Sequence, residues 1–264
     1  MAAVRASQRQ PESAFVLHSH DWSESSLILE LFCRDQGRVV AVAKGAKRPY
    51  SQLRPVLMPF QRLHVAFGAK RTADAEVWLL RQAEWAGGPA WPGGPALLPG
   101  FYLNELLMRM LARHDPHPGL FDAYALTLQA MGEPTLLQAA LRSFELILLR
   151  ELGHLPDLGV LTVSHQPVRA GERYELSPQL GVVAARWEGD ADASPVTLDG
   201  EVLLALAQAM SPTAPSAAAW VPALMGVCLQ ALGELKAISR GLIHYHLGSQ
   251  TLRTRQLMIE LQQP

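Results

Sequence analysis

The sequence contains few of the residues from which stapled or metal-bound domains are built. Its 264 residues include two cysteines, Cys33 and Cys228, which lie far apart among apolar neighbours. We therefore expect two small buried side chains rather than a disulfide framework, although spacing alone leaves a single disulfide open. No Walker A sequence, GxGxxG run, GxSxG elbow or HExxH pair is present. These absences remove the most recognisable nucleotide-binding and hydrolytic classes.

Long apolar runs are also missing. No run approaches the ~20 apolar residues that a membrane span needs. Residues 1–12 lack the apolar segment of a signal peptide and have the composition of a loose tail. Apolar residues make up 49% of the chain and charged residues 18%, as in globular proteins. We therefore expect a cytoplasmic protein of one or two domains.

Acidic residues are missing from one long segment. No Asp or Glu occurs between Asp35 and Asp74, although the whole chain carries a formal net charge of −1. The cations of this segment are Arg38, Lys44, Lys47, Arg48, Arg54, Arg62, Lys70 and Arg71. The rest of the chain is net acidic. A local basic field in a nearly neutral protein indicates a site for a polyanion.

Short, β-prone segments separated by turns fill the first part of the chain. Apolar alternation predicts five strands, over residues 13–20, 26–34, 38–44, 60–68 and 75–84. The sequence "RDQG" predicts a tight hairpin turn between the second and the third. Five short strands in about seventy residues favour a small barrel such as the OB-fold, which binds oligonucleotides on one face. An SH3-like barrel fits the strand count almost as well.

Helical periodicity follows a Gly/Pro-rich segment. Residues 85–100 interrupt both helix and strand patterns, so we place a linker there, between a barrel domain (1–84) and a helical domain (101–264). Helices are expected over residues 101–113, 119–131, 133–153, 200–210, 221–248 and 251–263. The third of these is apolar on most faces and should be the centre of its domain. Residues 155–200 form an irregular insert with a strand-like part at 173–187.

The densest part of the basic field is "VAKGAKRPYSQLRP", residues 42–55. On a barrel face its cations, together with Arg38, would contact phosphates and give sequence-independent affinity. Single-strand binders add aromatic rings on which bases stack. The available rings are Trp22, Tyr50, Phe60 and Phe67, and about half of these would serve the core instead. The alternative is a solvated loop whose lysines protect a strand edge from pairing.

Two histidine pairs are weaker candidates. His18 and His20 lie two residues apart on an expected strand and would face the same way. They could form half of a metal site, but no Cys, Asp or Glu completes it by spacing. His244 and His246, on an expected helix, point to different faces. We therefore expect exposed histidines rather than metal ligands.

Several segments, in order, resemble the bacterial recombination mediator family RecO. They begin with "FVLHSHDWSESSLILELFCRDQGRVVAVAKGAKRP" and "LRPVLMPFQRLHVAF" in the barrel part. The likeness continues through "GFYLNELLMRML", "LRSFELILLRELG", "YELSPQLGVV" and "LGSQTLRTRQL". It covers nearly the whole chain, which makes it more specific than any single motif.

The resemblance implies an OB-fold followed by an α-helical domain, in a cytoplasmic, nucleoid-associated protein of the RecF pathway. It implies binding of single- and double-stranded DNA, annealing of complementary strands, and help in loading RecA onto DNA coated by the single-strand binding protein SSB. RecR would be a partner, and no cofactor, catalytic residue or membrane is implied. The acidic, apolar-ended SSB tail would meet a pocket on the helical domain, matched here by Arg142, Leu152, Lys236 and Arg240.

The chain departs from some members of that family in one respect. Those members carry a four-cysteine zinc module after the "ELG" helix, whereas residues 155–200 here contain no cysteine. Packing must therefore hold this insert. Three other functions remain open from the residues alone: an OB-fold RNA-binding protein, a protein-binding adaptor without DNA activity, and a hydrolase whose carboxylates meet only in space.

Overall fold

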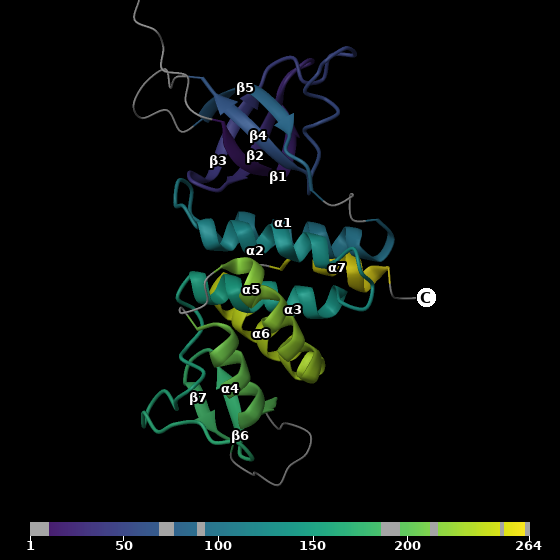
Figure 1. Cartoon of the computed structure of the whole chain (residues 1–264). Coiled ribbons are helices and arrows are strands. Elements are labelled where there is room, and N and C mark those ends of the chain that lie inside the picture. The colour runs from purple at the N-terminus through teal and green to yellow at the C-terminus, as the bar shows by residue number, and fades with distance from the viewer. Residues whose placement is uncertain are drawn as a thin grey trace, which may run out of the picture. The chain divides into compact units, whose positions relative to one another are not determined.

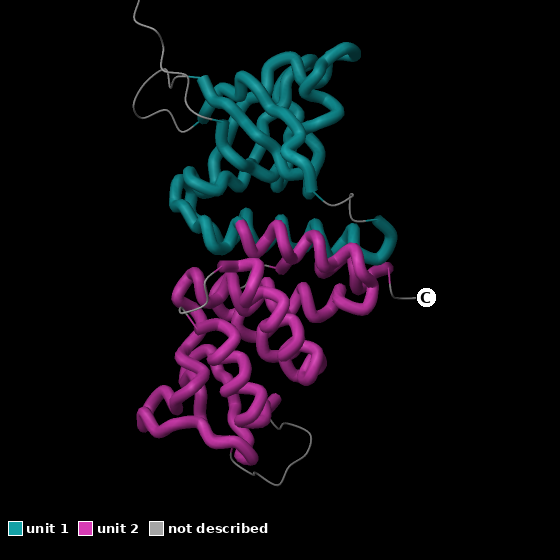
Figure 2. Tube along the Cα trace, viewed as in Figure 1, with its two compact units in different colours: residues 1–121, 264 teal, residues 122–263 magenta. Residues whose placement is uncertain are grey.

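The computed structural model describes residues 11–68, 77–88, 93–185, 196–211, 216–248 and 251–261. The chain divides into two compact units, residues 1–121 and 122–263, and the boundary falls within helix α2 (Pro118–Ala130) (Figure 1, Figure 2). The first unit therefore contains helix α1 (Leu97–Met110) as well as the strands. The division into a barrel domain (1–84), a linker (85–100) and a helical domain (101–264) stays a prediction.

Five strands form a closed barrel in the first unit, as the sequence predicts. Their order around the barrel is β1-β2-β3-β5-β4, with β3 and β5 parallel and the other neighbours antiparallel. This is the order of the OB-fold, which settles the choice against an SH3-like barrel. The strands are β1 (Glu12–Asp21), β2 (Leu27–Cys33), β3 (Gly37–Ala43), β4 (Arg62–Phe67) and β5 (Val77–Trp85).

Alternate residues of the strands fill the barrel. Leu29, Leu31 and Cys33 of β2 are fully buried and face the same core as Val39 and Ala41 of β3. Each large aliphatic side chain contributes roughly 1.5–3 kcal/mol by leaving water. The alternate apolar residues that predict these strands are thus the ones that form the barrel core. Both cysteines are free and buried, as expected from the sequence.

A bulge in β1 connects the barrel to α1. The pairing of β1 with β2 shifts between Val16 and His18, which leaves Leu17 without a partner in the strand. The carbonyl oxygen of Leu17 accepts a hydrogen bond of 3.0 Å from the side-chain amide of Asn104, a buried residue of α1. A bulge residue loses its ladder bonds, so a side chain must satisfy them. Asn104 therefore fixes α1 on the barrel.

The second unit is built around helix α3 (Leu137–Glu151). Residues 139–149 are buried without interruption, and the helix packs against α5 and α6. The single helix expected over residues 221–248 is wrong, since a short 3-10 helix, η2 (Leu229–Ala231), separates α5 from α6. The remaining helices are α4 (Gly200–Ala209), α5 (Ala217–Cys228), α6 (Leu232–Leu247) and α7 (Arg253–Glu260), and η1 (Gly94–Ala96) precedes α1.

The insert that lacks cysteine folds as a small sheet in the order β7-β6-β8. Its strands are β6 (Arg173–Ser177), β7 (Gly181–Ala184) and β8 (Thr197–Asp199). The buried hydroxyl of Tyr174 donates to Glu172 at 3.0 Å and accepts the backbone N–H of Arg169 at 2.8 Å. Arg173 pairs with Asp199 at 2.7 Å. Packing and these hydrogen bonds hold together the described part of the insert.

One helical segment is long and apolar enough to cross a membrane by those two criteria alone. It is Ala217–Leu247, which comprises α5, η2 and α6, and a third of its most apolar window (33%) is buried within the protein. Core helices of soluble proteins pass the same test. Because α5 and α6 both pack on α3, one face of this stretch contributes to the core of the second unit.

Candidate nucleic-acid interface

The barrel has two ends with different surroundings. Asp21 pairs with Leu27, which pairs with Ala43, so the ends of three strands meet at what we call the loop end. Residues 22–26 and the segment that begins at Lys44 leave the barrel there. At the opposite turn end, residues 34–36 join β2 to β3. The cations of the acid-free segment are distributed over both ends.

Residues 44–57 cap the loop end. Ala46 and Leu57 belong to the barrel core, and Leu53 and Val56 pack against it. Gly45 adopts a positive φ of 73°, which lets the chain turn and return the backbone N–H of residue 48 to the Gly45 carbonyl oxygen at 3.1 Å. The apolar residues of this segment point inward, so its charged residues lie outside.

Three cations of the cap are free to meet a ligand. Lys44, Arg48 and Arg54 are exposed. Within the described residues none of the three makes an ion pair with a carboxylate. An exposed cation without a counter-ion keeps its full charge for a phosphate, and binding releases the counter-ions of the nucleic acid. These three side chains form the strongest candidate site in the barrel.

Lys47 is held differently from its neighbours. Its ammonium group lies 2.9 Å from an Asp21 carboxylate oxygen and donates to the Ser23 carbonyl oxygen at 3.3 Å. Its backbone N–H donates to the Ser25 carbonyl oxygen at 3.0 Å. Lys47 therefore connects residues 21–25 with the cap, and Asp21 offsets part of its charge. The sequence shows an acid, Asp21, just before Trp22, but its spacing from Lys47 does not reveal that the two residues pair.

The four candidate rings divide into two pairs. Phe60 and Phe67 are buried, and Phe67 packs against Trp78 with ring centroids 5.1 Å apart. Trp22 and Tyr50 are exposed, at 64% and 96%. The expectation that about half of the rings serve the core is confirmed. Both exposed rings belong to segments at the loop end.

Arg38 lies at the turn end in a charged cluster. One nitrogen of its guanidinium is 3.5 Å from Glu30, and Arg113 reaches the other Glu30 oxygen at 3.0 Å. The backbone supports this contact, since the His114 N–H donates to the Arg38 carbonyl oxygen at 3.0 Å. Burial lowers the pKa of Arg38, an effect that Glu30 opposes. Arg38 therefore faces a carboxylate, Glu30, that it shares with Arg113.

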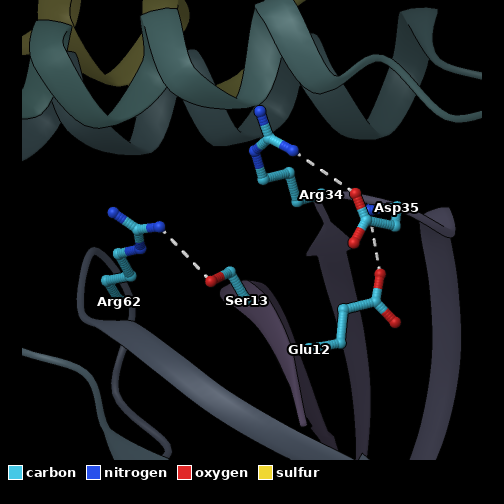
Figure 3. Close-up of polar contacts among 5 residues, drawn as sticks. All are labelled: Glu12, Ser13, Arg34, Asp35 and Arg62. Atoms are coloured by element: carbon cyan, nitrogen blue, oxygen red, sulfur yellow. Dashed lines mark hydrogen bonds and ion pairs between the residues drawn. The ribbon is translucent and has the colours of Figure 1, made fainter. Parts of the chain in front are cut away.

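Arg62 also lies at the turn end, where its guanidinium donates to the Ser13 hydroxyl at 3.3 Å (Figure 3). The same guanidinium lies over the ring of Phe121 at 5.8 Å from its centroid. Such a contact favours a cation that is already partly desolvated. Arg62 is therefore held in part by the protein itself. Lys70 and Arg71 lie outside the described residues.

Substitution of Glu30 by Gln tests whether Arg38 belongs to the interface. The change removes the negative charge between Arg38 and Arg113, so a DNA contact by Arg38 should strengthen binding several-fold and steepen the salt dependence by up to about 0.7 per phosphate for single strands. Fluorescence anisotropy with a labelled oligonucleotide over a salt series measures both. Glu84→Gln changes the net charge equally, on an exposed carboxylate of β5, and serves as control. Identical behaviour of the two variants would exclude Arg38.

The paired histidines of β1 lie side by side. The rings of His18 and His20 are 4.3 Å apart, so they face the same way as expected. Burial and the neighbouring His20 lower the pKa of His18, while Glu30 acts in the opposite direction. Among the residues that the structure describes, no three His, Cys, Asp or Glu side chains are grouped to hold a metal ion. Both side chains are exposed on β1, as expected.

The four residues matched to the SSB-tail pocket do not share one environment. Arg142 is only 7% exposed, and its guanidinium contacts Glu145 at 2.9 Å and the Ser239 hydroxyl at 3.3 Å. That hydroxyl in turn donates to the Glu145 carboxylate. Lys236 and Arg240 are exposed one helical turn apart on α6, and Leu152 is half-buried. A peptide arriving from solvent would meet Lys236 and Arg240, whereas Arg142 is already paired.

Comparisons with known proteins agree along the whole chain. The family model "Recombination protein O N terminal" matches residues 9–88, and "Recombination protein O C terminal" matches residues 95–256. The DNA repair protein RecO of Albidiferax ferrireducens is 49% identical over 264 residues, which cover 99% of this chain and 98% of that protein. The DNA repair protein RecO of Verminephrobacter eiseniae is also 49% identical, over 99% of both chains. A third, from a Polaromonas species, is 49% identical over 95% of this chain and 96% of its own. The chain therefore belongs to the RecO family of DNA repair proteins.

Proposed function

We propose that this protein is a DNA-binding recombination mediator that holds DNA at the loop end of its barrel. The observation that carries the proposal is the group of exposed, unpaired cations on the cap, Lys44, Arg48 and Arg54. In an OB-fold, oligonucleotides bind the face of the second and third strands together with the loops that join strands 1 and 2 and strands 4 and 5. Residues 22–26 are the first of these loops, and Lys47 joins them to the cap. Membership of a family of DNA repair proteins supports DNA as the polyanion.

The mechanism needs no bond to be made or broken by the protein. Cations that hold one strand by its phosphates reduce the repulsion that opposes a second strand. The base edges remain free, so a complementary strand can pair with the bound one. The protein therefore anneals strands as a scaffold rather than as an enzyme, and the arrangement calls for no cofactor.

The second unit brings the protein to its substrate. The exposed cations Lys236 and Arg240 would pair with the acidic SSB tail, and aliphatic side chains near Leu152 would receive its apolar end. Docking on SSB raises the effective concentration of the barrel at coated DNA. With RecR, the complex would then open this DNA for RecA.

Simultaneous substitution of Lys44, Arg48 and Arg54 by Ala tests the DNA site. If the protein neutralises about four phosphates of a single strand, log affinity falls with log salt at a slope near −3, from roughly −0.7 per contact. Loss of three contacts should flatten the slope to about −1 and weaken binding strongly at low salt. Anisotropy of a labelled oligonucleotide across a salt series measures this slope.

The matched control is Lys236→Ala with Arg240→Ala, which removes exposed cations from the second unit. This variant should keep the slope of the unmodified protein, because these residues serve a peptide in the proposal. An unchanged slope in the barrel variant would remove the cap from the DNA site. Competition with an RNA oligonucleotide of the same sequence separates DNA binding from an RNA-binding function, which would favour RNA through its 2′-hydroxyl groups. An adaptor without DNA activity would bind an SSB-tail peptide and no oligonucleotide.

A further inference from the structure

Two large aromatic side chains are exposed at the loop end beside the free cations. Tyr50 is 96% exposed and Trp22 is 64% exposed. Within the described part of the chain, neither ring packs against another ring or a guanidinium. Most of each side chain is open to solvent. Both rings are therefore available to a ligand.

Backbone turns fix the position of each ring. The N–H of Ser51 donates to the Arg48 carbonyl oxygen at 3.0 Å, which closes a turn with Pro49 and Tyr50 at its centre. Proline is favoured at the first central position because its φ is already set for the turn. Tyr50 thus stands at the tip of a rigid turn, where little backbone entropy remains to be lost on binding.

Trp22 is presented by a second turn that is joined to the first segment. Its backbone N–H donates to the Ser26 carbonyl oxygen at 3.1 Å. The Lys47 ammonium bonds to Asp21 and to the Ser23 carbonyl oxygen, on either side of Trp22. The Gly45 N–H donates to the Ser26 hydroxyl at 3.4 Å. These bonds hold the two ring-bearing segments next to each other, with Lys44 and Arg48 in the same segment as Tyr50.

We propose that Trp22 and Tyr50 stack on unpaired bases and give the barrel its preference for single-stranded over double-stranded DNA. This inference rests on the proposed DNA site and names what that site selects. Charge alone does not supply such a preference, because a duplex offers phosphates at higher density than a single strand does. The bases of a duplex are already stacked on each other, whereas those of a single strand can stack on exposed rings. Cations on the cap supply affinity, and the two rings supply selectivity.

The test compares Trp22→Ala and Tyr50→Ala, separately and together, in the full chain. Anisotropy measures the dissociation constants for a labelled single strand and for the matched duplex. Each substitution should weaken single-strand binding by roughly fivefold or more, since a stacked ring contributes about 1–3 kcal/mol per base. Duplex affinity and the salt slope should stay unchanged, because no phosphate contact is lost. Tyr50→Phe keeps an aromatic face and should retain most of the binding.

Trp85→Ala is the matched control, because Trp85 is about as exposed as Trp22, at 61%, but lies at the end of β5, where it pairs with Leu63 of β4 and belongs to neither ring-bearing segment. A strand of equal length with abasic sites provides a second control, since it keeps the phosphates and removes the bases. The unmodified protein should bind this strand as weakly as the double variant binds the normal one. Equal losses for single strand and duplex, or full binding by the double variant, would overturn the role of the rings while leaving the cation site intact. Absence of DNA binding by the unmodified protein would overturn the proposed function itself.

Discussion

Replacement of Arg142 by Met is expected to lower the free energy of unfolding by about 3–5 kcal/mol. The side chain is buried in α3, and its guanidinium lies 2.9 Å from the Glu145 carboxylate. Methionine fills a similar volume, so the loss comes from removing a positive charge beside the buried Glu145 carboxylate rather than from a cavity. Urea denaturation of the full chain, followed by far-UV circular dichroism, measures the change.

The double variant Arg142→Met with Glu145→Leu separates this mechanism from a packing defect. Removal of both partners leaves no buried charge, and apolar replacements of a buried pair are often neutral or stabilising. Most of the lost stability should therefore return, although the Ser239 hydroxyl then lacks its acceptor. If the double variant is as unstable as the single one, the ion pair is not what stabilises this part of the core.

Variants of Arg142, Lys236 and Arg240 distinguish an effect on stability from an effect on peptide binding. If Arg142 acts inside the core, its substitution should reduce SSB-peptide affinity only as far as it unfolds the protein. Lys236→Ala with Arg240→Ala should instead weaken peptide binding at unchanged stability, because both side chains are exposed on α6. Isothermal titration with an acidic peptide that ends in Phe distinguishes the two. Normal peptide binding by the Lys236→Ala, Arg240→Ala variant would show that the peptide site lies elsewhere.

The strands of the barrel were predictable because the alternate apolar residues that mark them in the sequence are the ones that fill the barrel core. Alternation placed the third strand at residues 38–44, and the structure has it at Gly37–Ala43. The bulge at Leu17 was not predictable, since its hydrogen bond comes from Asn104, far along the chain. The break between α5 and α6 was missed for a related reason. Apolar periodicity continues across η2, and only packing on α3 decides where the helix bends.

The candidate site was predictable in composition but not in geometry. A count of cations treats Arg38 and Lys44 alike, yet Arg38 meets Glu30 together with Arg113, which is 75 positions away in sequence. Likewise, the sequence offers Tyr50 and Phe60 alike as rings for stacking, and only the structure shows that Tyr50 is exposed and Phe60 buried. The pairing of Arg142 did leave a signal, an acid three residues later on a helix that is otherwise apolar.

Substitution of Gly37 by Ala is expected to be the most damaging change of a single methyl group in the barrel. Gly37 has a φ of +67° at the end of the β2–β3 turn, where an L-residue loses roughly 1–2 kcal/mol. A Cβ there would also overlap the backbone carbonyl of Asp115. The segment that follows α1 would have to move away and break the bond from the His114 N–H to the Arg38 carbonyl oxygen. We expect a total loss of about 2–4 kcal/mol, measurable by urea denaturation.

Gly87→Ala isolates the backbone component, because Gly87 has a φ of +80° with no atom near the position of a Cβ. It should lose only the roughly 1–2 kcal/mol of the left-handed conformation. Equal losses in the two variants would mean that residues 113–115 do not pack on the turn as described. DNA binding by the folded Gly37→Ala protein gives a second measurement. The cap lies at the opposite end of the barrel from Gly37, so the salt slope of this variant for single-stranded DNA should match that of the unmodified protein. If the DNA site were at the turn end, the variant would lose DNA binding together with stability.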